Sequence, residues 1–228
     1  MADSGDLPIS GGGALQNWTL NPYLALGLQR NPFVAEDEPG VPEPLWLDRG
    51  WSDAPPKQAA RLVQVLGVKG AGKTSHLSHW QAQTGGAYCY YPPGWGRLKM
   101  PQVAAIAYWD EADRIPLPYL LSALIWARLT RATIVVGTHR DLGAIARRLN
   151  LAVQTIHLQP FDGETLSVWA NRRIAAVRLP NQNSTLTLTP ERAEKIAAIA
   201  QGSWRDAADA LHIWAAATAA ETCKKLGE

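Results

Sequence analysis

One glycine-rich loop constrains this sequence more than any other feature. It reads Gly-Val-Lys-Gly-Ala-Gly-Lys-Thr over residues 67–74, after an apolar run at 62–66 and before a helical pattern over 73–83. The pattern G-x-x-x-x-G-K-[ST] binds phosphate when it follows a strand and opens a helix, as it does here. Its glycines let backbone N–H groups surround a phosphate at the start of the helix. We expect Lys73 to reach the β- and γ-phosphates of a nucleoside triphosphate and the Thr74 hydroxyl to bind magnesium. The predicted phosphate-binding residues are Gly67, Gly70, Ala71, Gly72, Lys73 and Thr74.

Residues 61–160 alternate between short apolar runs and helical patterns. Strands that are apolar on both faces and separated by helices are typical of a parallel sheet with helices on both faces. We therefore predict an α/β fold, followed after Pro160 by a small all-helical lid. The expected strands are 62–66, 87–91, 103–109, 133–137 and 155–158. The expected helices are 73–83, 117–129 and 142–149 in the α/β part, and 164–177, 190–200 and 204–226 in the lid.

Composition changes near residue 57 and divides the chain into three expected parts. Eight of the 16 prolines lie in residues 1–56, so we expect this acidic leader to hold little regular structure. Residues 57–160 are the expected core and residues 161–228 the expected lid. Within the leader, Asn21-Pro22-Tyr23 recurs as Asn31-Pro32-Phe33, and two such turns around an apolar segment can hold a leader against a neighbouring domain.

A carboxylate pair follows the third expected strand. Asp110 and Glu111 come at the end of this apolar run, Asp110 lying 37 residues after Lys73. Asp110 is expected to hold the magnesium water shell, and Glu111 to polarise a water molecule that attacks the γ-phosphate. Successive carboxylates suit phosphate transfer to water, whereas a kinase delivers the phosphate to a bound acceptor. Asp113 is expected to cap a helix.

A polar residue, Thr138, follows the fourth expected strand. In a sheet of order 5-1-4-3-2 this strand lies between the strand of the glycine-rich loop and the strand of the carboxylates. Thr138 is therefore expected beside the γ-phosphate, where it can orient the attacking water. A rival interpretation is that segment 138–141 resembles the [NT]-K-x-D motif that binds guanine in GTPases, although His139 replaces its lysine. A simpler role for Asp141 is the N-cap of the next helix.

Composition argues against two classes of protein. No uncharged apolar run reaches the roughly 18 residues of a membrane-spanning helix, and the N-terminus carries Asp3 and Asp6 where a secretion signal carries basic residues. The two cysteines, Cys89 and Cys223, have no metal-binding spacing and suit a reducing compartment. We expect a cytoplasmic protein that does not contact a membrane.

The net charge of +2 hides an asymmetry along the chain. Residues 1–56 hold eight acidic and two basic residues, whereas residues 57–228 hold 12 acidic and 20 basic ones. A basic body of this kind can attract double-stranded DNA, and an acidic leader can compete for the same surface. A solvated basic face is the alternative. The candidate contacts to DNA phosphates are Arg97, Lys99, Arg172, Arg173 and Arg178.

Together these motifs resemble the AAA+ ATPases, which are P-loop NTPases. The resemblance rests on the loop at 67–74, the WDEAD carboxylates, Thr138 and a helical lid that contains Gly-Ser-Trp-Arg over residues 202–205. It implies that Arg205 touches the γ-phosphate. It also implies a homo-oligomer in which Arg148, or its neighbour Arg147, reaches into the site of another subunit.

The resemblance also has a narrower form and some departures. The Asn-Pro-Phe leader and the pattern Leu-x-Pro-Phe-x-x-Glu at 158–164 look like the branch that contains secretion-pathway A-type and transposition-regulator ATPases. The segment 92–102 is too short for the helix that usually links the second and third strands. That helix is therefore expected to be shortened or missing.

The sequence therefore predicts an ATP-binding and ATP-hydrolysing switch that uses magnesium, whose nucleotide state governs self-assembly and binding to DNA or a protein partner. One alternative is a small-molecule phosphotransferase with an acceptor pocket between segment 92–102 and the lid. Others are a GTPase and an assembly module that binds ATP without turnover. The presence of both Asp110 and Glu111 argues against the last.

Overall fold

The computed structural model describes residues 21–34 and 46–227, and the chain divides into two compact units. Of the described residues, the sheet unit contains 46–162 and 197–207, and the helical unit contains 21–34, 163–196 and 208–227. The expected leader is shared between them, because residues 21–34 belong to the helical unit and residues 46–56 to the sheet unit. Among the described residues, no helix combines the length and apolarity needed to cross a membrane.

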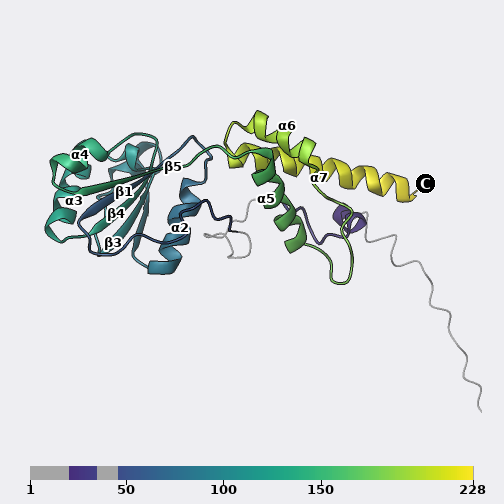
Figure 1. Cartoon of the computed structure of the whole chain (residues 1–228), viewed down its shortest axis with the longest axis horizontal. Helices are drawn as coiled ribbons and strands as arrows, with labels where there is room; N and C mark the ends of the chain where they lie inside the picture. Colours follow the sequence, from purple (N-terminus) through teal and green to yellow (C-terminus); the bar gives the residue numbers. More distant parts are fainter. Residues whose placement is uncertain (1–20, 35–45, 228) are drawn as a thin grey trace, which may run out of the picture. The chain divides into compact units, whose positions relative to one another are not determined.

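Five parallel strands form the sheet, in the order β2-β3-β4-β1-β5 (Figure 1). This is the order on which the expectation for Thr138 was based, and the parallel strands confirm the α/β fold class. Leu66 pairs with Thr138, and Asp110 pairs with Gly137, so β1, β3 and β4 end at one edge of the sheet. The strands are β1 (Arg61–Leu66), β2 (Ala87–Tyr90), β3 (Ile106–Asp110), β4 (Thr133–Thr138) and β5 (Ala152–His157).

The strand β5 begins three residues earlier than its apolar pattern indicates. Ala152 pairs with Arg61, and the register continues along the whole of β1. This strand lies at the edge of the sheet and is only partly buried, so its early residues carry no continuous apolar run. Backbone pairing, which side-chain patterns do not reveal, sets its start.

Helices cover both faces of the sheet (Figure 1). On one face, α2 (Lys73–Thr84) packs Leu77 and Trp80 against Val63 and Tyr108. On the other face, α3 (Leu117–Leu129) and α4 (Gly143–Arg148) share a core with strand residues such as Trp109. Between β2 and β3 the described chain has a short 3-10 helix, η3 (Gly94–Leu98), which agrees with the expected shortening.

The C-terminal helical region contains α5 (Gly163–Ala176), α6 (Pro190–Ala200) and α7 (Trp204–Gly227). These helices were all expected from the sequence. Thr189 acts as the expected cap of α6, because its hydroxyl accepts a hydrogen bond from the N–H of Arg192 over 3.4 Å.

The two Asn-Pro turns of the leader have the same local geometry. Asn21 accepts a hydrogen bond from the N–H of Tyr23, at the 3-10 helix η1 (Pro22–Leu26), and Asn31 accepts one from the N–H of Phe33. The Phe33 ring packs against the rings of Trp169 and Trp214, in α5 and α7. The segment 21–34 is therefore part of the core of the helical unit.

Candidate functional site

The glycine-rich loop turns between β1 and α2, and two of its glycines are required by its shape. Gly70 and Gly72 have φ angles of +81° and +92°, in the left-handed region that favours glycine. A Cβ atom at Gly70 would also collide with the hydroxyl of Ser203. The loop is thus built for close approach of another group to its backbone.

Lys73 begins α2 and is buried against its own loop. Its ammonium group donates to the carbonyl oxygens of Gly67 and Val68, each over 3.0 Å, and lies 3.5 Å from Nδ1 of His139. Burial lowers the pKa of Lys73, and the negative charge of Glu111 opposes this effect. The structure therefore places a cation at the mouth of the loop.

Thr74 and Asp110 come together from α2 and β3. The Thr74 hydroxyl donates to Oδ2 of Asp110 over 2.7 Å, and the Tyr88 hydroxyl donates to the same oxygen over 3.0 Å. Burial raises the pKa of Tyr88, so its hydroxyl remains a donor. Magnesium prefers oxygen ligands such as one carboxylate and one hydroxyl with water and phosphate oxygens, so Thr74 and Asp110 fit that ion.

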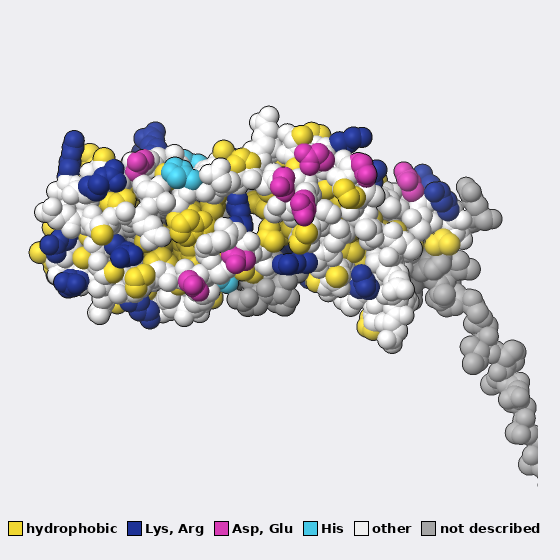
Figure 2. Space-filling model, in the orientation of Figure 1, with side chains coloured by type: hydrophobic (Ala, Val, Ile, Leu, Met, Phe, Trp, Pro, Cys, Tyr) yellow, Lys and Arg dark blue, Asp and Glu magenta, His cyan; other side chains and the backbone are white. Residues whose placement is uncertain are grey.

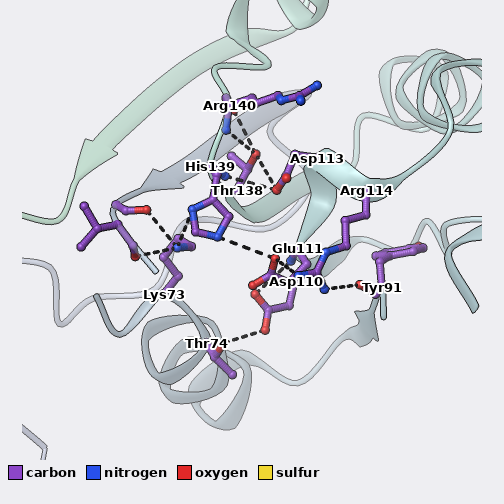
Figure 3. A network of polar contacts seen from close by, with 12 residues as sticks. Lys73, Thr74, Tyr91, Asp110, Glu111, Asp113, Arg114, Thr138, His139 and Arg140 are labelled. Atoms are coloured by element: carbon purple, nitrogen blue, oxygen red, sulfur yellow. Dashed lines mark hydrogen bonds and ion pairs between the residues drawn. The ribbon is translucent and has the colours of Figure 1, made fainter. Parts of the chain in front are cut away.

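Glu111 follows β3 in a strained backbone conformation. Its φ angle is 57°, which is unusual for a residue with a side chain and costs about 1–3 kcal/mol. Its Oε2 atom lies 3.0 Å from Nη2 of Arg114 and 3.7 Å from Nε2 of His139 (Figure 3).

Thr138 ends β4 beside this network. Its buried hydroxyl accepts a hydrogen bond from the N–H of Arg140 and lies 3.4 Å from Oδ1 of Asp113. The same Asp113 oxygen accepts from the N–H of His139 over 3.2 Å. Asp113 therefore joins the 3-10 turn η4 (Ala112–Arg114) to the segment after β4. The prediction that it caps a helix was wrong, because the next helix starts only after Pro116.

Asp141 stabilises the start of α4. Its Oδ1 atom accepts hydrogen bonds from Gln64 in β1 and from the N–H of Gly143, both over 2.6 Å. These bonds lower the pKa of Asp141. The N-cap position itself is Leu142, so the predicted cap is one residue out of place and the aspartate acts through a turn ahead of the helix. This structural role accounts for Asp141 without a guanine base.

The two arginines implied by the resemblance lie in different places. Arg205 is exposed in the first turn of α7, and a Cβ atom at Gly70 would lie 3.3 Å from the Arg205 Cβ atom. The backbone N–H of the adjacent Trp204 donates to the Gly70 carbonyl oxygen over 2.9 Å, and this bond brings Arg205 close to the loop. Arg148 is exposed at the end of α4, just before β5 begins. Because β1 and β5 are parallel, the start of β5 lies at the edge of the sheet opposite the end of β1, so Arg148 lies away from the loop that follows β1. Its action in a neighbouring subunit stays a prediction.

Sequence reasoning missed several residues that hold this site together. Arg49, from the leader, donates to the carbonyl oxygen of Ala71 over 3.0 Å and also to that of Gln159. Burial lowers the pKa of Arg49. An isolated arginine in an otherwise acidic leader was its only signal. The sequence signal for Tyr88, Arg114 and His139 was weaker still. Their roles depend on the pairing of β2 with β3 and on the turns that follow β3 and β4.

Comparison with known proteins gives distant structural matches only. No described protein family and no curated protein matches the sequence. Among solved structures, Cdc6p from Pyrobaculum aerophilum matches 68% of this chain at 17% identity with a TM-score of 0.46. The RuvB Holliday junction branch migration motor of Thermotoga maritima matches 66% at 18% identity, also with a TM-score of 0.46. A STAND protein with a tetratricopeptide repeat sensor from Pyrococcus horikoshii matches 63% at 13% identity with a TM-score of 0.38.

These matches cover 55%, 52% and 26% of the three proteins, so the aligned region is about half of their length or less. At such TM-scores the likeness supports no argument about activity. The assignment of a P-loop NTPase type of fold depends on the sheet order and on the loop between β1 and α2.

Proposed function

We propose that this chain is an AAA+-type ATPase, which binds ATP with magnesium and hydrolyses it. The observation that carries the proposal is that Lys73, Thr74, Asp110, Glu111 and Thr138 meet at one edge of the sheet, around a loop shaped by glycines (Figure 3). They come from the ends of two adjacent strands, β3 and β4, and from α2, the helix that follows β1. In open parallel sheets, ligands bind at this edge.

Each residue has a chemical task in this proposal. Lys73 exchanges its bonds with the loop carbonyls for bonds to phosphate oxygens, and loop N–H groups add further donors. Thr74 and Asp110 hold magnesium, which supplies positive charge against the phosphates when bound. Glu111 accepts a proton from the attacking water, and Thr138 orients that water.

Release of inorganic phosphate from ATP, without any added acceptor, tests this proposal against a phosphotransferase. The wild-type chain is expected to release phosphate, and Glu111→Gln is the matched variant. Turnover that begins only when a small-molecule acceptor is added would instead identify a kinase. A parallel assay with GTP decides the base, because the GTPase alternative predicts a preference for guanine.

We further propose that the bound nucleotide controls self-assembly, as the resemblance implies. Arg205 next to the loop is suited to sense the γ-phosphate, and the exposed Arg148 is free of the loop of its own subunit and suited to act on another. Mass photometry with ADP and with a slowly hydrolysed ATP analogue tests this. A larger species is expected with the analogue only, and identical masses with both nucleotides would remove the assembly role.

A basic surface favours nucleic acid as the partner. Segments 57–61, 128–133 and 148–152 meet at the edge of the sheet opposite the glycine-rich loop, and none of them contains an acidic residue. Figure 2 shows Lys and Arg side chains gathered over the α3–α4 end of this unit. The exposed basic residues of this edge, apart from Arg148 with its proposed role in another subunit, are Lys57, Arg128 and Arg131. Phosphate contacts of this kind bind DNA without sequence preference.

One of the earlier candidates for DNA contact, Arg173, is less suited to it. Arg172 and Arg173 lie on α5 in the helical unit, and the Arg173 guanidinium lies 5.0 Å above the ring of Trp169. A cation engaged with an aromatic ring is less available to phosphate. We therefore propose the basic edge, rather than Arg173, as the DNA-binding surface.

A further inference from the structure

The imidazole of His139 lies between the loop lysine and the catalytic carboxylate proposed above (Figure 3). Its Nδ1 atom is 3.5 Å from Nζ of Lys73, and its Nε2 atom is 3.7 Å from Oε2 of Glu111. The backbone of His139 is held in place, because its N–H donates to Asp113 over 3.2 Å. The ring thus faces one residue of the phosphate loop and one of the carboxylate pair.

The chemistry of the two neighbours determines which ring nitrogen carries the proton. The ammonium group of Lys73 has three donors and no lone pair, so Nδ1 of His139 must be the acceptor in that contact. A neutral imidazole then carries its proton on Nε2, which faces the Glu111 carboxylate. Both contacts, at 3.5 and 3.7 Å, are longer than an ordinary hydrogen bond.

Resting on the proposed ATP hydrolysis, we propose that His139 is a positioning residue that aims Glu111 at the attacking water. Among the described residues, Arg114 and His139 both face Oε2 of Glu111. This assigns Oε1 as the oxygen that takes the proton from water while the water oxygen forms its bond to the γ-phosphorus. The bond between the γ-phosphorus and the bridging oxygen breaks, and ADP leaves with that electron pair.

This arrangement also links the two halves of the site. When Lys73 turns to phosphate oxygens, the Nδ1 atom of His139 loses a donor, whereas its Nε2–H still faces Oε2 of Glu111. The ring therefore supports the carboxylate in the presence of substrate without binding the phosphates itself. Loss of the ring should lower kcat and leave the KM for ATP nearly unchanged.

Two amide substitutions test the proposal, because each reproduces one ring nitrogen. Glutamine places an amide N–H near the position of Nε2, and asparagine places one near that of Nδ1. We expect kcat of His139→Gln within about 3-fold of wild type, and kcat of His139→Asn and His139→Ala lower by about 10-fold or more, with KM changed by less than about 3-fold. Equal losses for the two amides, or changes in KM alone, would overturn the proposal.

A double variant tests whether His139 affects kcat through Glu111 or through another residue. Added to Glu111→Gln, the change His139→Ala is expected to cause no further loss of kcat, because the carboxylate that it positions is already gone. A full additional loss would show that His139 acts elsewhere.

The tautomer is measured independently of turnover. Long-range ¹H–¹⁵N NMR spectra of the labelled full chain, near pH 8.5, report which nitrogen of each of its five histidines carries the proton. The His139 signal is assigned by its absence from His139→Gln. We expect the Nε2–H form, and a dominant Nδ1–H form or an even mixture would overturn the inference. If the wild-type chain released no phosphate, the proposed function would fail, while this measurement would still decide where His139 holds its proton.

Discussion

The hydroxyl of Thr74 donates a 2.7 Å hydrogen bond to Oδ2 of Asp110, and so joins the first turn of α2 to the end of β3. The two residues are 36 positions apart in the sequence. Because the folded sheet and helix already hold both oxygens together, little ordering of these two residues would remain if they bound magnesium as proposed. Preorganisation of this kind reduces the entropic cost of binding.

Removal of the loop cation is expected to abolish tight ATP binding. Lys73→Ala removes the charge that is proposed to face two phosphates in a partly dry site, which should cost several kcal/mol, or roughly 100-fold or more in Kd. Isothermal titration calorimetry measures the effect. Lys69→Ala is the matched control, since Lys69 is an exposed lysine of the same loop and its loss should leave Kd within about 3-fold. Equal affinities of wild type and Lys73→Ala would remove the proposed nucleotide site.

Glu111→Gln is expected to retain ATP and to hydrolyse it about 100-fold more slowly or worse, because an amide cannot accept the proton of the attacking water. Single-turnover phosphate release gives the rate, and a filter-binding assay confirms that ATP is held. Unchanged turnover would mean that Glu111 has a structural role only and that another group activates the water.

Arg49 is expected to stabilise the phosphate loop from the leader. Arg49→Ala removes charged hydrogen bonds to the carbonyl oxygens of Ala71 and Gln159, each worth about 1.5–3 kcal/mol when such bonds are well formed. Thermal unfolding should show a lower Tm, and calorimetry a weaker affinity for ATP. The exposed Arg97 in η3 provides the control, Arg97→Ala, which should change neither value. An Arg49→Ala chain as stable as wild type would contradict a role in holding the loop.

Stability is expected to fall in mild acid because of His76. This residue donates from Nδ1 to the carbonyl oxygen of Gly72, and burial lowers its pKa from 6.5 to about 4. Between these two values the unfolded chain binds a proton that the folded chain excludes, so the free energy of unfolding decreases as the pH falls below 6.5. From pH 7.5 to pH 5 the loss should be about 2 kcal/mol, at roughly 1.36 kcal/mol per pKa unit.

Urea unfolding of His76→Asn at both pH values tests this origin. The asparagine amide replaces the Nδ1 donor and does not titrate, so most of the pH dependence should disappear. The exposed His212, changed to Gln, is the control and should leave the dependence as it is. If His76→Asn loses as much stability in acid as wild type, other groups cause the effect.

Binding to DNA is expected to depend on the basic edge and on salt. If Arg128 and Arg131 both contact phosphates, Arg128→Ala with Arg131→Ala should reduce the log–log salt slope by up to about 2 units, at roughly 0.9 per phosphate. Fluorescence anisotropy on a labelled duplex, with an ATP analogue at several salt concentrations, measures the slope. The pair Arg172→Ala with Arg173→Ala removes the same charge from α5 and should have the smaller effect. No binding even in low salt would leave a protein as the better partner.

Much of the fold and part of the site could be predicted from local patterns. The loop at 67–74, the carboxylates Asp110 and Glu111, and Thr138 are each defined by a few neighbouring residues whose types the chemistry restricts. The strand order was a premise of the expectation for Thr138, and the structure has that order. These motifs are informative because a substitution within them directly changes the backbone conformation of the loop or the charge of the site.

The tertiary structure alone decided how these pieces are held. Asp113 was expected to cap a helix and instead binds the segment after β4, and Asp141 acts one residue before its expected N-cap. Arg49 and His139 reach the site from a leader and a loop whose local sequence carries no motif for such contacts. A side chain's partner depends on which segments the fold brings within a few ångströms, and that proximity arises from strand register and helix packing, which no local run of residues encodes.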